Sequence, residues 1–192
     1  MAKQRWQKTK LRLAKNHKWD WTGKSGYNVF VANRGAVRFE YPQGWIIKPD
    51  DDADIKFVDQ EPPDDLCILR MTLLQLRPDI DWTGLPLPEM LAAATKDSEQ
   101  IVLSRSAPVL LRRQNLEIAW RQHRFVDPVE HREACSHTCL ARSGTVLPLI
   151  TFEYWPEDAG RFAPVWEHIM ATLRLGEYVK DPRVGATPQR YG

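Results

Sequence analysis

Cysteine is scarce in this chain, with 3 in 192 residues, an odd number and no regular spacing. Small chains held together by disulfides use a larger, even set, so we expect reduced thiols and a reducing compartment. No apolar run approaches the roughly 18 residues that a membrane-spanning helix needs. The basic N-terminal segment is not followed by an apolar stretch with a small-residue cleavage site. We therefore expect a cytoplasmic protein without a transmembrane segment.

Sequence motifs of common enzymes are also missing. The chain has no G-x-S-x-G nucleophile motif, no glycine-rich phosphate loop and no H-E-x-x-H metal motif. Its five histidines have no serine or cysteine partner that spacing alone would identify. A site assembled from distant residues stays open, because catalytic triads need not be adjacent in sequence. The expectation is a protein that is not an enzyme, with no catalytic residues and no cofactor.

The composition is that of a globular protein. Hydrophobic residues make up 43% and charged residues 27% of the chain, and there are eight tryptophans. A chain of this length fits one domain, which would bury roughly 70% of its unfolded surface. It can therefore form a hydrophobic core without metal or disulfide support.

Charge is distributed unevenly along the chain. Residues 1–24 carry eight Lys or Arg against Asp20 alone, a net charge of +7, so the rest of this +2 chain carries −5. Residues 50–65 hold eight acids against Lys56. We divide the chain into a basic N-terminal arm (1–26), a single domain (27–175) and a loose C-terminal tail (176–192).

The basic arm interleaves tryptophan with lysine and arginine, as suits phosphate contacts and base stacking. It could equally lie on an anionic membrane surface or fold over its own domain. The candidate partner-binding residues are Lys3, Arg5, Trp6, Lys8, Lys10, Arg12, Lys15, Lys18, Trp19 and Trp21.

Short β-rich segments dominate the domain, interrupted by two helical patterns. Strands are expected at 27–32, 36–42, 44–49, 55–59, 66–76, 117–125, 131–141 and 145–155. A helix is expected over 89–103, after Pro88, and a second one through Phe162, Trp166, Ile169 and Leu173, ending before Gly176. Strands, helix, strands and helix without regular βαβ alternation indicate an α+β fold with an antiparallel sheet.

Three stretches carry a resemblance to a known family: "VRFEYPQGWII", "TCLARSGTVLPLITFEYW" and "APVWEHIMATLRL". Over roughly residues 36–175 the chain resembles the PsbP-like fold family, which includes a Ran-binding nuclear import factor and type VI secretion effector chaperones. The resemblance implies an antiparallel sheet of about seven or eight strands flanked by helices. It also implies a family whose members mostly bind other proteins and share no active site.

The stretch "VEHREACSHTCL" (129–140) has the strongest metal-site character in the sequence. The weak candidate ligands are Cys135, His137, Cys139 and His123. On a strand, alternate residues share one face, but they lie about 6.6 Å apart, and positions four apart lie about 13 Å apart. Zinc ligands must all lie within about 2.3 Å of the ion, so we expect no metal and interpret the thiols as small core side chains.

The neighbours of this strand depend on its two turns. A two-residue loop at Ser143 and Gly144 would place Cys135 opposite Phe152. An even-length loop after Phe125 would place Ile118 and Trp120 on the cysteine face, whereas an odd-length loop would bring in His123 and Arg121. A second metal-like pattern, Asp50, Asp52, Asp54 and Glu61, has the spacing of a calcium loop, but Ile55 stands where that loop needs glycine. We expect a solvated acidic loop there.

These observations favour a protein-binding module that acts as an adaptor, chaperone or accessory subunit and has a protein partner. Tryptophan and arginine are enriched at protein interfaces, which agrees with this hypothesis. The alternative is binding of nucleic acid or an anionic surface through the arm, with an affinity that falls steeply with salt.

Overall fold

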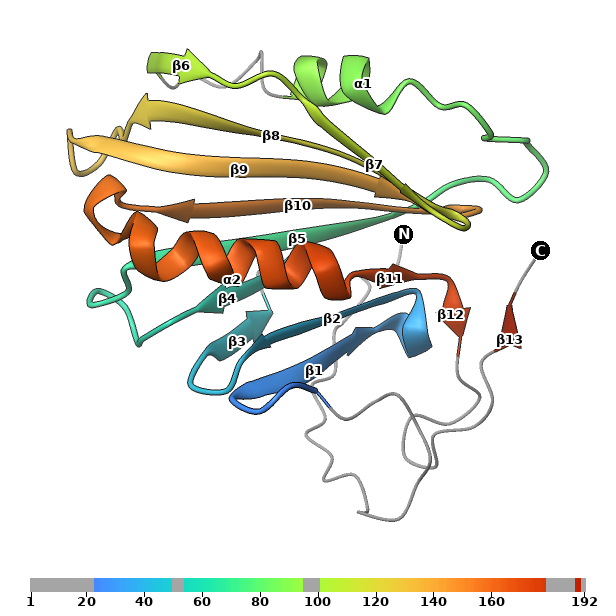
Figure 1. Cartoon of the computed structure of the whole chain (residues 1–192), viewed down its shortest axis with the longest axis horizontal. Coiled ribbons are helices and arrows are strands. Elements are labelled where there is room, and N and C mark those ends of the chain that lie inside the picture. The colour runs from blue at the N-terminus through green and yellow to red at the C-terminus, as the bar shows by residue number, and fades with distance from the viewer. Residues whose placement is uncertain (1–22, 50–53, 95–100, 179–188, 191–192) are drawn as a thin grey trace.

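The computed structural model of the chain describes residues 23–49, 54–94 and 101–178, and the backbone of 189–190. Its main element is an antiparallel eight-stranded sheet (Figure 1). Seven of its strands lie in the order β3 (Ile46–Pro49), β4 (Ile55–Val58), β5 (Cys67–Gln75), β10 (Val146–Tyr154), β9 (Glu133–Arg142), β8 (Leu116–Val126) and β6 (Ile101–Arg105). The eighth, β7 (Val109–Arg113), also pairs with β8. The predicted α+β class and antiparallel sheet are confirmed.

A smaller sheet is formed by β1 (Tyr27–Ala32), β2 (Val37–Pro42) and β11 (Arg174–Leu175). Its aromatic side chains pack against the main sheet: the ring centroids of Phe30 and Phe39 lie 5.0 and 5.5 Å from that of Phe57 on β4. Beyond it, β12 (Glu177–Tyr178) pairs with β13 (Gln189–Arg190). Side chains of the small sheet thus belong to the same hydrophobic core as those of the main sheet.

Two α-helices in the described residues pack on opposite faces of the main sheet, each against its own hydrophobic cluster. Figure 1 shows α2 lying across the strands. Helix α2 (Ala159–Thr172) follows a 3-10 turn and buries its apolar stripe on one face. That stripe consists of Phe162, Trp166, Ile169 and Met170. Helix α1 (Leu87–Ala94) places Leu87 and Leu91 on the other face, against Ala119, Leu140 and Leu147. Because both faces are covered, β9 is buried along almost its whole length.

The first predicted helix is wrong in its length. Helix α1 ends at Ala94, and Ile101 and Val102 belong to strand β6, where they pair with Val126 and Phe125 of β8. Two β-branched residues beside an available strand gain more from pairing than from continuing a helix. Strand β7 was not expected at all. It is joined to β8 by a two-residue turn in which Gln114 has φ +46°.

Strand β7 also caps the C-terminus of α2 through hydrogen bonds from Arg113. The guanidinium of Arg113 donates hydrogen bonds to the carbonyl oxygens of Met170 (2.5 Å) and Ala171 (2.8 Å). These carbonyls lie in the last helical turn and have no partner within the helix, so a cation there satisfies them and complements the helix dipole.

We expect Arg113→Ala to lower the free energy of unfolding by about 1 kcal/mol, because two helix-end carbonyls lose their donors. Urea denaturation followed by circular dichroism measures this change. Arg77→Ala is the matched control, since the Arg77 side chain is 73% exposed and pairs with the exposed Asp79. Equal losses in the two variants would contradict a capping role for Arg113.

Candidate functional site

Strand β9 places Cys135, His137 and Cys139 on one face, toward α2, as the alternation predicted. Their partners on β10 are Tyr154, Phe152 and Ile150. The expected pairing of Cys135 with Phe152 is wrong by two residues, because the turn is formed by Gly144 and Thr145, inside a Ser143–Val146 bridge. A shift of two keeps the same face, so the apolar surroundings were predicted correctly.

The pairing of β9 with β8 decides between an even-length and an odd-length loop after Phe125. Trp120 of β8 lies opposite Cys139, and Ile118 lies opposite Ala141, as an even-length loop requires. His123 lies on the opposite face, across from Ser136. The four metal-ligand candidates therefore do not converge. In the part of the chain that the structure describes, no group of three His, Cys, Asp or Glu side chains could hold a metal ion.

Burial keeps this cluster uncharged. The Nε2 atom of His137 lies 2.9 Å from the hydroxyl of Tyr154, and its ring stacks on Trp166 at 4.9 Å. Burial, with a smaller effect of His123, lowers the pKa of His137 to about 4. Burial also raises the pKa of Cys139 well above its usual range. A neutral imidazole beside protonated thiols is part of the core rather than a reactive pair.

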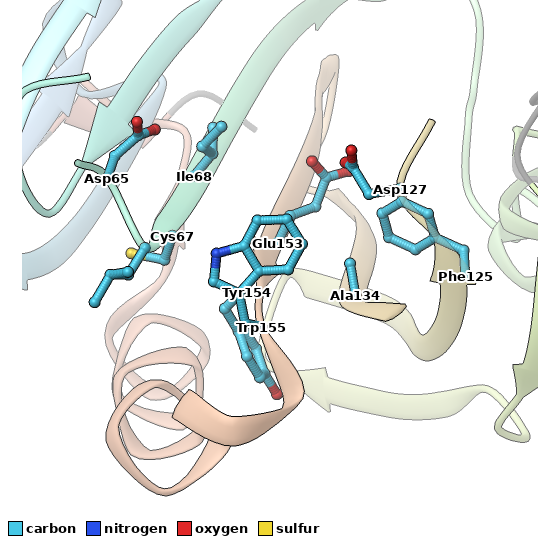
Figure 2. Close-up of a pocket in the computed structure, with 10 residues that line it drawn as sticks. Asp65, Cys67, Ile68, Phe125, Asp127, Ala134, Glu153, Tyr154 and Trp155 are labelled. Carbon is cyan, nitrogen blue, oxygen red and sulfur yellow. The ribbon is translucent and has the colours of Figure 1, made fainter. Parts of the chain in front are cut away.

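A small surface pocket lies at the end of the main sheet where β5 and β9 begin and β8 and β10 end, and Tyr154 is one of the residues that line it (Figure 2). Its polar wall contains the carboxylates of Asp65, Asp127 and Glu153, and Trp155 lies beside them. Two of these carboxylates have partners in the chain. Asp127 accepts hydrogen bonds from the backbone N–H groups of residues 129 and 130, and Glu153 accepts one from Arg70 at 2.9 Å. These two side chains stabilise a turn and a cross-strand pair.

The acidic calcium-like pattern is only partly described. Asp50 and Asp52 lie outside the described residues. Asp54 accepts a hydrogen bond from the Thr72 hydroxyl at 2.7 Å, and Glu61 pairs with Lys48 at 2.5 Å. The flanking segments are strands β3 and β4, as predicted. The two acids that can be placed therefore serve separate contacts.

The feature that stands out is an apolar surface along residues 101–113, which we call the β6–β7 edge. Strands β6 and β7 pair with the same side of β8, and each pairs with β8 alone among the described strands (Figure 1). Five aliphatic side chains on this edge are exposed. They are Ile101 (68%), Leu103 (53%), Val109 (37%), Leu110 (61%) and Leu111 (38%). They account for five of the eight large exposed hydrophobic residues described.

The sequence reasoning missed this edge, although one signal was present. Pro108 precedes the run Val-Leu-Leu-Arg-Arg, and Gln114-Asn115 then separates it from the next strand. Two β-rich runs separated by two turn-forming residues predict a hairpin. The exposure of its leucines was not predictable in the same way, because an apolar run normally indicates burial.

Most of the basic arm lies outside the described residues. Its described part is residues 23–26, which form a turn into β1, where the backbone N–H of Lys24 donates to Glu40 at 3.1 Å. The predicted binding residues of the arm, Lys3 to Trp21, lie outside the described residues. Binding of nucleic acid or an anionic surface by the arm therefore stays a prediction.

Comparison with known proteins shows the family to which this chain belongs. The family model described as Alr1449 matches residues 28–179. The chain belongs to the Alr1449 family. An uncharacterized protein of Nostoc sp. (strain PCC 7120), alr1449, is 40% identical over 181 residues, which cover 94% of this chain and 92% of that protein.

Several solved structures resemble this Alr1449 family member, and the resemblance is one of fold alone. The solution structure of cyanobacterial PsbP (CyanoP) from Synechocystis sp. PCC 6803 has a TM-score of 0.58 at 11% identity, covering 84% of this chain and 99% of that one. A crystal structure from Bacteroides thetaiotaomicron VPI-5482 has a TM-score of 0.55 at 16% identity. It covers 77% of this chain and 47% of that one. The predicted resemblance to the PsbP-like fold is confirmed.

Among the described residues of this Alr1449 family member, neither helix is long and apolar enough to cross a membrane.

Proposed function

We propose that this protein is a non-enzymatic, cytoplasmic protein-binding module, acting as an adaptor, chaperone or accessory subunit. Its binding surface is the β6–β7 edge, which receives an extended segment of another protein as an added strand. The observation that carries this proposal is the exposure of aliphatic side chains on both faces of the edge strand β7. Leu110 is 61% exposed on the α1 face, and Val109 and Leu111 are 37% and 38% exposed on the α2 face.

Edge strands carry unpaired N–H and C=O groups, and isolated proteins usually protect them with charges, prolines or bulges. Strand β6 has such protection, because its register with β8 shifts between Val102 and Ser104, and Pro108 follows it. Strand β7 carries Arg112 and Arg113 at its C-terminal end, but it has no bulge: its five residues pair with β8 in regular register, and Val109, Leu110 and Leu111 are uncharged. A bound strand would satisfy these backbone groups and cover Leu110, which is how strand addition recognises extended peptides.

Two further observations support the proposal. His137, Cys135 and Cys139 are the residues of β9 that could take part in chemistry, and they are buried in the core and neutral. The three cysteines are free and buried, which agrees with a reducing compartment. The binding role therefore falls to the surface rather than to a catalytic centre.

The test is affinity purification of the tagged protein from its own host, with quantitative mass spectrometry. We expect wild-type protein to retain a defined partner and Leu110→Asp to lose it at least about tenfold, since a buried charge at the centre of an interface costs more than about 1.4 kcal/mol. Ile80→Asp is the matched control: Ile80 is 41% exposed in the loop between β5 and α1. Retention of the partner by Leu110→Asp, or its loss in both variants, would contradict the proposed surface.

A further inference from the structure

The chemistry of the bound segment can be inferred from a row of charges that ends at the β6–β7 edge; this inference rests on the proposed function. On the α1 face of the sheet, Arg112 of β7 lies opposite Glu117 of β8, which lies opposite Arg142 of β9. The Oε2 atom of Glu117 accepts hydrogen bonds from the Nε (2.9 Å) and Nη2 (2.5 Å) atoms of Arg142. Its Oε1 atom contacts the guanidinium of Arg112.

One carboxylate is therefore shared by two guanidinium groups. The inner arginine is well compensated: the Arg142 side chain is 9% exposed, and the carboxylate of Asp81 also lies within its electrostatic reach. The outer one is not buried, because the Arg112 side chain is 74% exposed at the open side of the sheet. The row thus alternates positive, negative, positive from β9 outward, and the next position belongs to whatever strand joins β7.

The same charge bias holds along the whole edge. Residues 101–113 contain Arg105, Arg112 and Arg113 and no acidic residue. A second copy of this chain would bring the same positive charge to the interface, where like charges facing each other across strands are destabilising. An acidic segment would bring the complementary charge and would speed association as well. Charge therefore favours a different, acidic partner over a second copy.

We propose that the segment that binds β7 is an extended antiparallel strand with an acidic residue opposite Arg112 and aliphatic residues opposite Leu111, Leu110 and Val109. Antiparallel pairing orders these positions as acid followed by three aliphatic residues. The acid continues the charge row on the α1 face. The aliphatic residues cover Leu110 on that face and Val109 and Leu111 on the other.

The first probe is a fluorescein-labelled peptide, Gly-Ser-Glu-Val-Ile-Val-Ser-Gly, compared with the same peptide in which Lys replaces Glu. Binding to the full chain is measured by fluorescence anisotropy. We expect the Glu peptide to bind about five- to tenfold more tightly than the Lys peptide, the size of a cross-strand charge reversal. Arg112→Glu should reverse this preference. Arg77→Glu should leave it unchanged, since the Arg77 side chain is 73% exposed and lies off the edge.

The outcomes separate this inference from the proposed function. Equal binding of both peptides, or a preference that Arg112→Glu does not alter, would overturn the acidic partner while leaving strand addition intact. A concentration-dependent dimer in sedimentation velocity that Leu110→Asp abolishes would instead identify a second copy as the occupant. Failure of both peptides to bind, together with an unchanged set of cellular partners in Leu110→Asp, would overturn the surface itself.

Discussion

Replacing Trp166 with alanine is expected to lower the free energy of unfolding by about 3–5 kcal/mol, the cost of removing a large buried aromatic side chain. Trp166 is 1% exposed and lies between α2 and the sheet. Its ring centroids lie 4.9 Å from that of His137, 5.8 Å from Trp120 and 6.1 Å from Phe152. The alanine variant leaves a cavity at the centre of these contacts. Guanidinium denaturation followed by circular dichroism measures the loss.

Two further variants, Trp166→Phe and Trp82→Ala, are the comparisons for the loss expected in Trp166→Ala. The indole N–H of Trp166 is buried, and no described residue accepts a hydrogen bond from it. Trp166→Phe removes that unsatisfied donor and keeps most of the ring, so it should cost less than half as much as Trp166→Ala. Trp82 is only partly buried and its indole N–H bonds the carbonyl of Arg77 at 2.8 Å. If Trp166→Ala costs no more than Trp82→Ala, the packing described for α2 is wrong.

Acidification is expected to destabilise the protein between about pH 6.5 and pH 4 through His137. The pKa of this histidine is lowered from 6.5 to about 4 in the folded state, chiefly by burial. The unfolded chain therefore binds a proton in this window that the folded chain does not, so stability is present above pH 6.5 and is lost as the pH falls. Between pH 7.5 and pH 5 this histidine alone contributes a loss of about 2 kcal/mol.

Burial, with smaller effects of Arg105 and Arg121, also lowers the pKa of His123, which adds a loss of the same sign. Urea denaturation at several pH values measures the sum. His137→Gln, which does not titrate, should flatten the profile in this window, although it is less stable than wild type at pH 7.5. The variant His131→Asn, at an exposed histidine, is the control for replacing a histidine outside the core. A wild-type profile that is flat from pH 7.5 to pH 5 would contradict the buried neutral imidazole.

Much of the fold follows from local pattern. The alternation in β9 and the apolar stripe of α2 each match a single period, and both elements were predicted within a few residues. The errors arose where tertiary contacts decide. Ile101 and Val102 fit a helix pattern, yet they pair with β8. The hairpin register shifted because the turn forms around Gly144 and Thr145, and a local sequence does not distinguish two adjacent two-residue turns.

The candidate site was less predictable for a physical reason. Whether Leu110 is buried depends on whether another strand lies beside β7, and this is a property of sheet order rather than of local sequence. The charge row of Arg112, Glu117 and Arg142 joins three strands whose alignment follows only from the register. The fold resemblance and the tryptophan content favoured the hypothesis of a binding protein, whereas the topology was needed to find the exposed β6–β7 edge on which the proposal rests.

The small sheet also determines when the protein can finish folding during its synthesis. Arg38 of β2 pairs with Arg174 of β11, and the backbone N–H of Glu40 donates to the hydroxyl of Thr172 at 3.1 Å. The two partners of the latter bond are 132 residues apart. Strands β1 and β2 are made early, as an isolated hairpin that is at best marginally stable. Their pairing with β11 and the bond to Thr172 can form only after residues 172–175 have been synthesised, so completion of the small sheet is a late step in folding.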